Sequence, residues 1–112
     1  MAALTWQEFD RVEMRVGRVI SVQDFPEARS PSYLLEIDFG EPIGRRQSSA
    51  AIQREYSKDE LDGRLVVAVT NFPPKQIANH ISEVLVLAAV DGDGQLRLLQ
   101  PDDQVALGSR VR

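Results

Sequence analysis

The chain has 112 residues and no cysteine, and its 13 basic and 17 acidic side chains give a net charge of −4. This length suits one domain with its own core, so we predict a single domain over residues 1–112. The missing cysteines exclude disulfides, thiolate metal sites and cysteine nucleophiles. The acidic balance excludes a bulk-basic nucleic-acid binder, and neither residues 1–56 nor residues 57–112 form a charged tail.

The N-terminus lacks a basic start followed by an apolar run, so it does not have the pattern of a signal peptide. The longest apolar run covers residues 84–90. It is far shorter than the roughly 20 residues that a membrane-spanning helix needs. We therefore expect a cytoplasmic protein without membrane insertion.

The first third of the chain predicts a short helix and a long strand. Thr5 and Glu8 form a capping-box pattern, which predicts a helix over Trp6 to Asp10. Residues 12–23 alternate between apolar and polar side chains, as in one long curved strand or two collinear halves. The pair Gly17-Arg18 interrupts this alternation, and a glycine within a strand predicts a bulge or a sharp bend.

The middle of the chain predicts two further strands and a second short helix. Residues 25–31 contain two prolines and are expected to form a loop. Residues 33–39 alternate cleanly, whereas residues 43–49 are a weaker strand with polar side chains at nearly every position. A second capping box at residues 57–60 begins a helix that Gly63 ends.

The second half predicts strands joined by loops. Residues 65–69 are apolar throughout, as in a strand buried on both faces. Residues 84–90 and 96–99 are expected to pair around a hairpin turn at Asp91–Gly94. Residues 75–82 are expected to be a connection with one helical turn.

These elements predict an all-β protein, because no strand alternates with a helix as in a parallel α/β sheet. A long bent first strand followed by a meander favours a five-stranded OB-fold barrel with short helical inserts and N- and C-terminal extensions. The helix at residues 57–61 lies where that fold has an insert between its third and fourth strands. We expect the barrel core to span about residues 9–100.

Both ends of the chain carry apolar side chains outside this core. They are Trp6, Phe9, Val105, Leu107 and Val111, and residues 108–112 are expected to form a basic tail. These side chains either cover the openings of the barrel or pair with a second copy in a homodimer.

The sequence offers little for catalysis. Ser48 and Ser49 have no histidine near them, and the single histidine, His80, has the setting of a solvated surface residue. The turn at Asp91–Gly94 lacks the distant glutamate of a calcium loop. No phosphate-binding glycine loop occurs. We therefore expect no enzymatic activity, no metal and no cofactor.

The expected third strand offers more for binding. In an extended chain Arg45, Gln47 and Ser49 point to one face, and Arg46 and Ser48 point to the other. Arginine side chains pair with phosphates, whereas glutamine and serine side chains form hydrogen bonds with base edges or sugars. Strands two and three of an OB barrel form its oligonucleotide-binding face. The alternative is that the polar side chains only protect an edge strand from aggregation.

Other side chains extend this candidate surface. The cations Arg15, Arg18, Arg29, Arg54 and Lys75 could join the patch. The aromatic residues Phe25, Tyr56 and Phe72 could stack on bases or contact apolar peptide groups.

Residues 9–19 read F-D-R-V-E-M-R-V-G-R-V, which resembles the opening of the tRNA-binding domain family, roughly F-x-x-V-x-x-R-V-G-K-I. Longer sequence segments resemble one branch of that family, the CsaA proteins. They stand at residues 25–29, 33–40, 47–50, 71–79, 82–87 and 98–102. The resemblance covers essentially the whole chain.

The resemblance implies a cytoplasmic OB-fold homodimer that binds tRNA. It also implies a chaperone role for unfolded exported preproteins, in cooperation with the Sec translocase motor. Ser49, Ser82, Asn71 and Pro74 match the pattern of the family. Gln76 to Asn79 stand where relatives carry Lys-Met-Arg-Gly, so two cations are lost, and Lys75 could replace one of them.

Six residues are the predicted RNA-binding set. We expect Arg29, Arg45 and Lys75 to neutralise phosphates, and Gln47, Ser49 and Ser82 to contact bases or ribose. The alternative ligand is an unfolded preprotein, which would lie in an apolar groove and pair with a strand edge. A net-positive patch on strands two and three favours RNA, and an apolar groove favours peptide.

Overall fold

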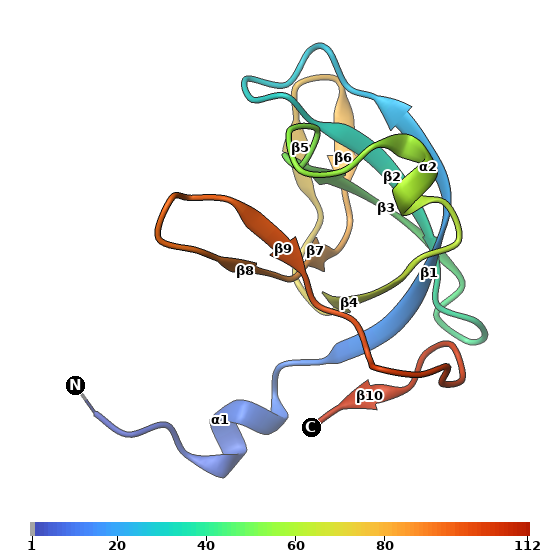
Figure 1. The fold of residues 1–112 in the computed structure, drawn as a ribbon. Coiled ribbons are helices and arrows are strands. Elements are labelled where there is room, and N and C mark those ends of the chain that lie inside the picture. The colour runs from blue at the N-terminus through green and yellow to red at the C-terminus, as the bar shows by residue number, and fades with distance from the viewer. Residues whose placement is uncertain (1) are drawn as a thin grey trace.

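The computed structural model describes residues 2–112, and its main feature is a bent sheet that curls into a nearly closed barrel (Figure 1). Five strands follow one another in the hydrogen-bonded order β3-β2-β1-β4-β7. Their bounds are β1 Met14–Asp24, β2 Tyr33–Asp38, β3 Arg45–Ala50, β4 Leu65–Val69 and β7 Leu85–Val86. The predicted all-β barrel of the OB type is therefore confirmed.

Strand β1 is one continuous strand that pairs with two of the barrel strands and, at its start, with the short C-terminal strand β10, Arg110–Val111. Its first half, residues 14–18, pairs with β4, and its second half, residues 18–24, pairs with β2. The register shift lies between Val19 and Ser21, so of the bulge or sharp bend predicted at Gly17-Arg18 the bulge is wrong, because pairing with β4 runs unbroken through Gly17. Gly17 has a different role, because a Cβ atom there would lie 2.5 Å from Ile37 Cγ2 and 2.8 Å from Phe39 Cδ1. The glycine lets β1 pack tightly against the barrel core.

Both predicted helices are present at the predicted positions. Helix α1 spans Trp6–Asp10, and helix α2 spans Lys58–Leu61. Each begins at a complete capping box, formed by Thr5 and Glu8 in α1 and by Ser57 and Glu60 in α2. Helix α2 buries Leu61 in the core, whereas α1 stands away from the barrel (Figure 1).

The capping box of α2 predicts a pH-dependent contribution to stability. The backbone N–H and side chain of Ser57 hold the pKa of Glu60 below its usual value of 4.5. A lowered folded-state pKa stabilises the fold above that usual value, and the stabilisation is lost as pH falls through the folded pKa. We expect Glu60→Gln to lower the free energy of unfolding at pH 7 and to match the wild type at acidic pH. Urea unfolding at both pH values would measure this, and an equal difference at both would contradict it.

Residues 75–82 form a β-hairpin, so the helical connection predicted there is wrong. Strand β5, Lys75–Ile77, pairs with β6, His80–Ser82. The turn between them has no glycine, and Ala78 adopts φ of 52°, a left-handed conformation that alanine seldom takes. The usual sequence signal of a tight hairpin turn is therefore missing.

The last third of the chain differs from the prediction in two places. The expected strand at residues 84–90 is divided at Leu87 into β7 and β8, the latter spanning Ala88–Val90 and pairing with β9, Leu96–Leu98. Leu87 connects the two sheets, because its N–H donates to Val67 O and its carbonyl accepts from Leu99 N. The expected basic tail contains strand β10, Arg110–Val111, which pairs with β1.

The core has two parts. The larger cluster fills the barrel and includes Leu35, Ile37, Phe39 and Val66. The smaller cluster, Val16, Leu65 and Val67, is covered by Leu107 and Val111 from the C-terminal segment. These two C-terminal side chains therefore pack against the barrel of their own chain. Trp6 does not, since it is 83% exposed.

Candidate nucleic-acid interface

The outer face of β2 and β3 carries the polar residues that the sequence singled out. Cross-strand pairs place Arg45 beside Asp38, Gln47 beside Glu36, and Ser49 beside Leu34. On the opposite side, Ser48 is fully buried next to the core residue Leu35. The predicted alternation along β3 is therefore confirmed. We call the side that carries Arg45, Gln47 and Ser49 the outer face.

The β5–β6 hairpin and the residues after it close the barrel against β3. Glu83 N donates to Gln47 O at 2.7 Å, and Gln47 N donates to Glu83 Oε1 at 3.0 Å. Ser49 N donates to Ser82 Oγ at 3.1 Å, and Ser48 Oγ donates to Val84 O at 3.1 Å. These bonds occupy the edge of β3, which is therefore not free for pairing with another strand at this point. They also bring Gln47, Ser49 and Ser82 together.

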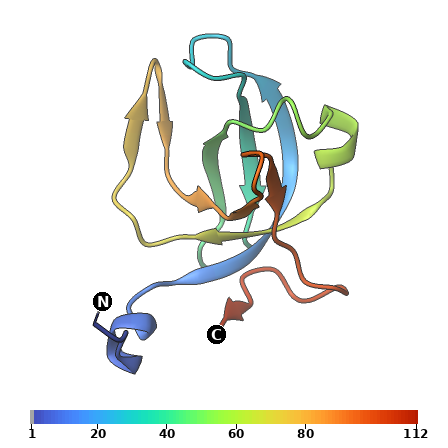
Figure 2. The same cartoon turned by 60° about the vertical axis from the view of Figure 1, so that its left-hand side comes forward.

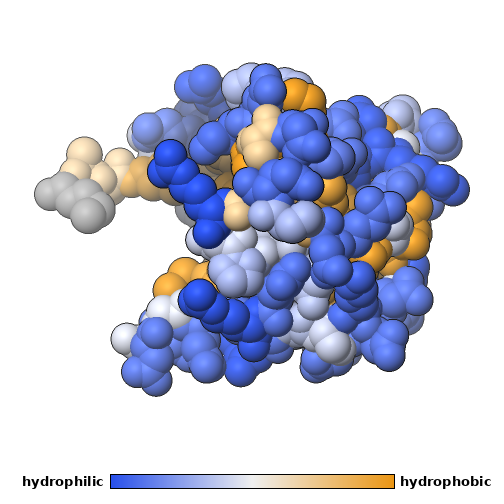
Figure 3. Space-filling view, turned by 90° about the horizontal axis from the view of Figure 1, so that it is seen from above, coloured by the Kyte–Doolittle hydropathy of each residue, from blue (hydrophilic) through white to orange (hydrophobic). Residues whose placement is uncertain are grey.

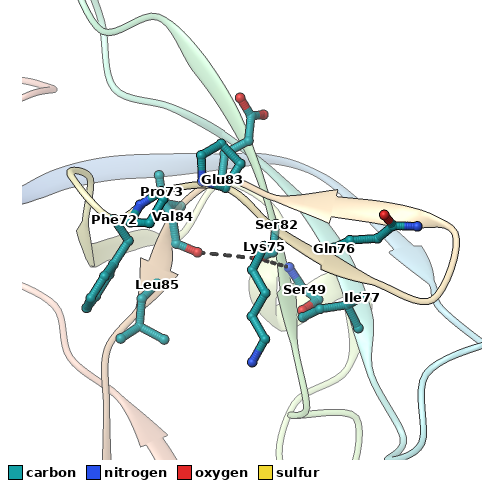
Figure 4. A pocket seen from close by; sticks show the side chains of 11 residues that line it. Ser49, Phe72, Pro73, Lys75, Gln76, Ile77, Ser82, Glu83, Val84 and Leu85 are labelled. Atoms are coloured by element: carbon teal, nitrogen blue, oxygen red, sulfur yellow. Dashed lines mark hydrogen bonds between the residues drawn. The ribbon is translucent and has the colours of Figure 1, made fainter.

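An apolar hollow of about 730 Å³ lies beside this junction, and we call it the hairpin groove. It is lined by Ser49, Phe72, Pro73, Pro74, Lys75, Gln76, Ile77, Ser82, Glu83, Val84 and Leu85. Phe72 is 53% and Leu85 is 49% exposed. The Lys75 side chain extends between Leu85 and Ser49, and the lining also includes one acidic residue, Glu83 (Figure 4). The groove thus combines apolar walls with a few polar groups, the usual composition of a ligand site.

The six predicted RNA-binding residues do not form one cluster. Ser49, Lys75 and Ser82 line the hairpin groove, and Gln47 follows on the outer face. Arg29 lies in the loop after β1, where it lines a separate hollow of about 440 Å³ with Asp24 and Gln53. The structure therefore joins four of the six, places Arg45 two residues before Gln47 on the same face of β3, and leaves Arg29 apart.

The outer face is not positive, because β2 places two carboxylates, Glu36 and Asp38, beside the one cation of β3 on this face, Arg45. Arg45 lies 3.6 Å from Glu36, and its cross-strand neighbour is Asp38. Two other candidate cations are held elsewhere. Arg15 donates to Gly108 O and bonds Glu13, and Arg18 donates to Gly63 O and Gln104. The prediction that Arg15 and Arg18 extend a basic patch is therefore wrong, because both side chains fix other segments to β1.

The three candidate aromatic residues differ in exposure to solvent. Phe72 is exposed at the groove, as its predicted role requires, but Phe25 and Tyr56 are buried and cannot stack on a base. His80 is not a freely solvated residue. Its Nδ1 lies 3.3 Å from Gln47 Nε2, and its ring meets Phe25 edge-on, with 5.2 Å between the ring centroids.

Sequence reasoning missed Ile77, Glu83 and Leu85, which all line the groove. Their placement depends on the β5–β6 hairpin, and the only available signal was the apolar pair Ile77 and Ile81, which alone does not define a hairpin. Within residues 2–112, no helix has the length and apolar character needed to cross a bilayer.

A nearly closed five-strand barrel with a polar outer face and an adjoining groove defines an OB-type binding domain. The chain belongs to the tRNA-binding domain family, because the family model described as "Putative tRNA binding domain" matches residues 14–110.

Similar proteins include methionine–tRNA ligases and CsaA chaperone proteins. A methionine–tRNA ligase of Thermococcus onnurineus is 38% identical over 107 residues, which are 96% of this chain and 14% of the ligase. The chain thus spans about one seventh of the length of such relatives. The CsaA chaperone protein of Picrophilus torridus is 49% identical with a TM-score of 0.91, covering 98% of this chain and 100% of that one. The chaperone CsaA of Bacillus anthracis is 43% identical with a TM-score of 0.93, covering 99% and 100%.

Proposed function

We propose that this chain is a cytoplasmic tRNA-binding protein of the CsaA type that acts by binding alone, as one domain and without enzymatic activity or a cofactor. The observation that carries the proposal is the junction of the outer face and the hairpin groove, where Gln47, Ser49, Lys75 and Ser82 come together. Membership of the tRNA-binding domain family supports tRNA as the ligand.

Each side chain has a role in this proposal. Lys75 and Arg45 contact phosphates from the two sides of the junction, and Arg29 contacts a more distant phosphate of the same tRNA. Gln47, Ser49 and Ser82 contact bases or ribose, and the exposed ring of Phe72 stacks on an unpaired base. Ser82 Oγ already accepts a bond from Ser49 N and donates to Val84 O at 3.4 Å, so this serine holds the junction and meets the ligand with its remaining acceptor capacity.

Arg45 and Gln47 provide a matched pair for testing this surface. They lie two residues apart on the outer face, but only Arg45 carries charge. We expect Arg45→Ala to weaken tRNA binding and to lower the logarithmic salt slope by about one unit. Gln47→Ala should weaken binding with the slope unchanged. Fluorescence titrations between 50 and 200 mM salt, about the range over which such slopes are clear, measure both quantities. An Arg45→Ala protein with wild-type affinity and slope would refute the assignment.

A second candidate ligand is an unfolded preprotein. In that case the chain would have the Sec translocase motor as a further partner. The specific observation in its favour is the hairpin groove, whose walls include Phe72, Ile77 and Leu85. Such a groove can hold apolar side chains of an extended segment. The outer face also lacks the net-positive charge that would favour RNA, and this too favours the preprotein as ligand. The two candidates differ in salt dependence, because apolar contacts release few counterions.

The proposal includes a homodimer formed through the ends of the chain. Leu4, Trp6 and Val12 are exposed along the N-terminal segment, and Val105 is exposed near the C-terminus. Seen from above, the barrel is largely hydrophilic with scattered apolar patches, and the N-terminal segment that projects from it is also partly apolar (Figure 3). A second view shows this segment and the C-terminus at the same end of the molecule (Figure 2). A second copy would cover these side chains.

We expect sedimentation at micromolar concentration to show a particle of twice the 12.5 kDa chain mass. Trp6→Ala should shift the protein towards monomer, because it removes the largest exposed apolar side chain. Val90→Ala, which shortens an exposed apolar side chain on β8, should leave the dimer intact. Trp6 is the only tryptophan, so its emission reports burial directly. A monomeric wild type would exclude the dimer.

A further inference from the structure

A third and smaller hollow lies on the outer face, beside Gln47. Its volume is about 140 Å³, well below the roughly 300–1,000 Å³ of sites for drug-sized ligands. The side chains that matter around it come from four strands. They are Ser21 and Gln23 of β1, Leu34 and Glu36 of β2, Gln47 of β3 and His80 of β6. A hollow of this size suits one planar ring system of a larger ligand.

The hollow has an apolar floor and a polar rim. Leu34 points to the outer face and yet is only 7% exposed, so it forms a floor that is shielded from water. His80 is half-buried at the rim, and its contacts with Gln47 and Phe25 fix the position of its ring. A flat apolar ring face can therefore lie on Leu34 while its edges meet polar groups.

Glu36 is the one charged side chain at this hollow. Its carboxylate is 44% exposed, and its ion pair to Arg45 is long, at 3.6 Å. An ionised carboxylate only accepts hydrogen bonds, and it repels the phosphates of a bound RNA. Such a carboxylate weakens RNA binding unless a base donates hydrogen bonds to it.

The four bases differ in what they offer to a carboxylate. Guanine presents two neighbouring donors, N1–H and the 2-amino group, which match the two carboxylate oxygens. Adenine and cytosine present one amino group beside a ring acceptor, and uracil presents one N–H between two carbonyls. An acceptor beside the second carboxylate oxygen is repulsive, so guanine is the base that Glu36 favours.

We propose that this hollow binds a single unpaired guanine of the RNA, with Glu36 as the residue that selects it. The inference rests on the proposed RNA-binding function and adds a base preference to it. Leu34 supports the ring, and Glu36 accepts from N1–H and the 2-amino group. The phosphate contacts of Arg45 and Lys75 remain independent of sequence.

The test uses fluorescence anisotropy with labelled oligouridine of about eight nucleotides, within the site size of one OB fold. Variants of this RNA carry one central guanosine, adenosine or inosine. We expect the guanosine oligomer to bind about tenfold tighter than oligouridine, the gain of one bidentate pair. Inosine lacks the 2-amino group, so it should lose most of this gain.

Glu36→Gln separates base selection from general binding. We expect this variant to lose the guanosine preference while binding oligouridine as well as the wild type or better, because a repulsive charge is gone. Asp93→Asn is the control, since it removes one negative charge at the exposed β8–β9 turn. It should keep the preference.

Three outcomes would overturn the inference, and they are distinguishable. Equal binding of all oligomers by the wild type refutes guanine selection and leaves RNA binding intact. A preference that survives in Glu36→Gln refutes the role of Glu36. Failure to bind any RNA, including intact tRNA, refutes the proposed function together with the inference.

Discussion

Gly17→Ala is expected to destabilise the protein by about 2–3 kcal/mol, the upper range for overpacking a core. The new Cβ atom would lie 2.5 Å from Ile37 Cγ2 and 2.8 Å from Phe39 Cδ1, and both side chains are fully buried. Neither can move without displacing the barrel core, so β1 must shift away from β2. For a chain of this size the midpoint of thermal unfolding should fall by roughly 10 °C.

Gly92→Ala is the control for this change. No atom lies within 4 Å of a Cβ atom built at Gly92. We expect its free energy of unfolding to stay within about 0.5 kcal/mol of the wild type, as for an ordinary surface substitution. Circular dichroism during urea and thermal unfolding gives both values. Equal stability of the two variants would contradict the claim that the core leaves no room for a Cβ atom at position 17.

Removing the three predicted phosphate contacts together should have the largest effect on binding. We expect the triple variant Arg29→Ala, Arg45→Ala and Lys75→Ala to bind tRNA roughly 100-fold more weakly at low salt, since bonds to charged groups contribute most. Its residual binding should be nearly independent of salt, because few counterions are released. Arg29 lies apart from the other two, so the full effect requires a tRNA that reaches both hollows.

The matched control removes three other cations, with Lys58→Ala, Arg97→Ala and Arg112→Ala. Both triple variants change the net charge from −4 to −7, which is −4 less three. If net charge alone governed binding, the two variants would be equally weak. We expect the control to retain most of its affinity. Equal losses in the two proteins would remove the support for a local site.

Local signals in the sequence were enough for the helices and the main strands. The capping boxes at Thr5 and Ser57 place both helices, because their bonds form within four residues of chain. The alternation of Arg45, Gln47 and Ser49 gives the outer face directly, since strand geometry fixes the direction of each side chain.

Features that depend on distant contacts were not predictable in this way. The β5–β6 hairpin turns at Ala78 in a conformation that the sequence does not favour, so the hairpin and the groove beside it were missed. Phe25 lies between polar and turn residues, yet the fold buries it against His80. The pairing of Arg45 with Glu36, which leaves the outer face without a net positive charge, follows only from the β2–β3 register.

The central claim is that tRNA is the ligand and that a few local cations bind it. The most direct test titrates the wild-type protein with tRNA and, separately, with an unfolded preprotein at 50 and 200 mM salt. With three phosphate contacts, tRNA affinity should fall by about 20- to 40-fold between these concentrations, whereas preprotein affinity should hardly change. A protein that binds the preprotein at both salt concentrations and shows no salt-dependent binding of tRNA would contradict the account.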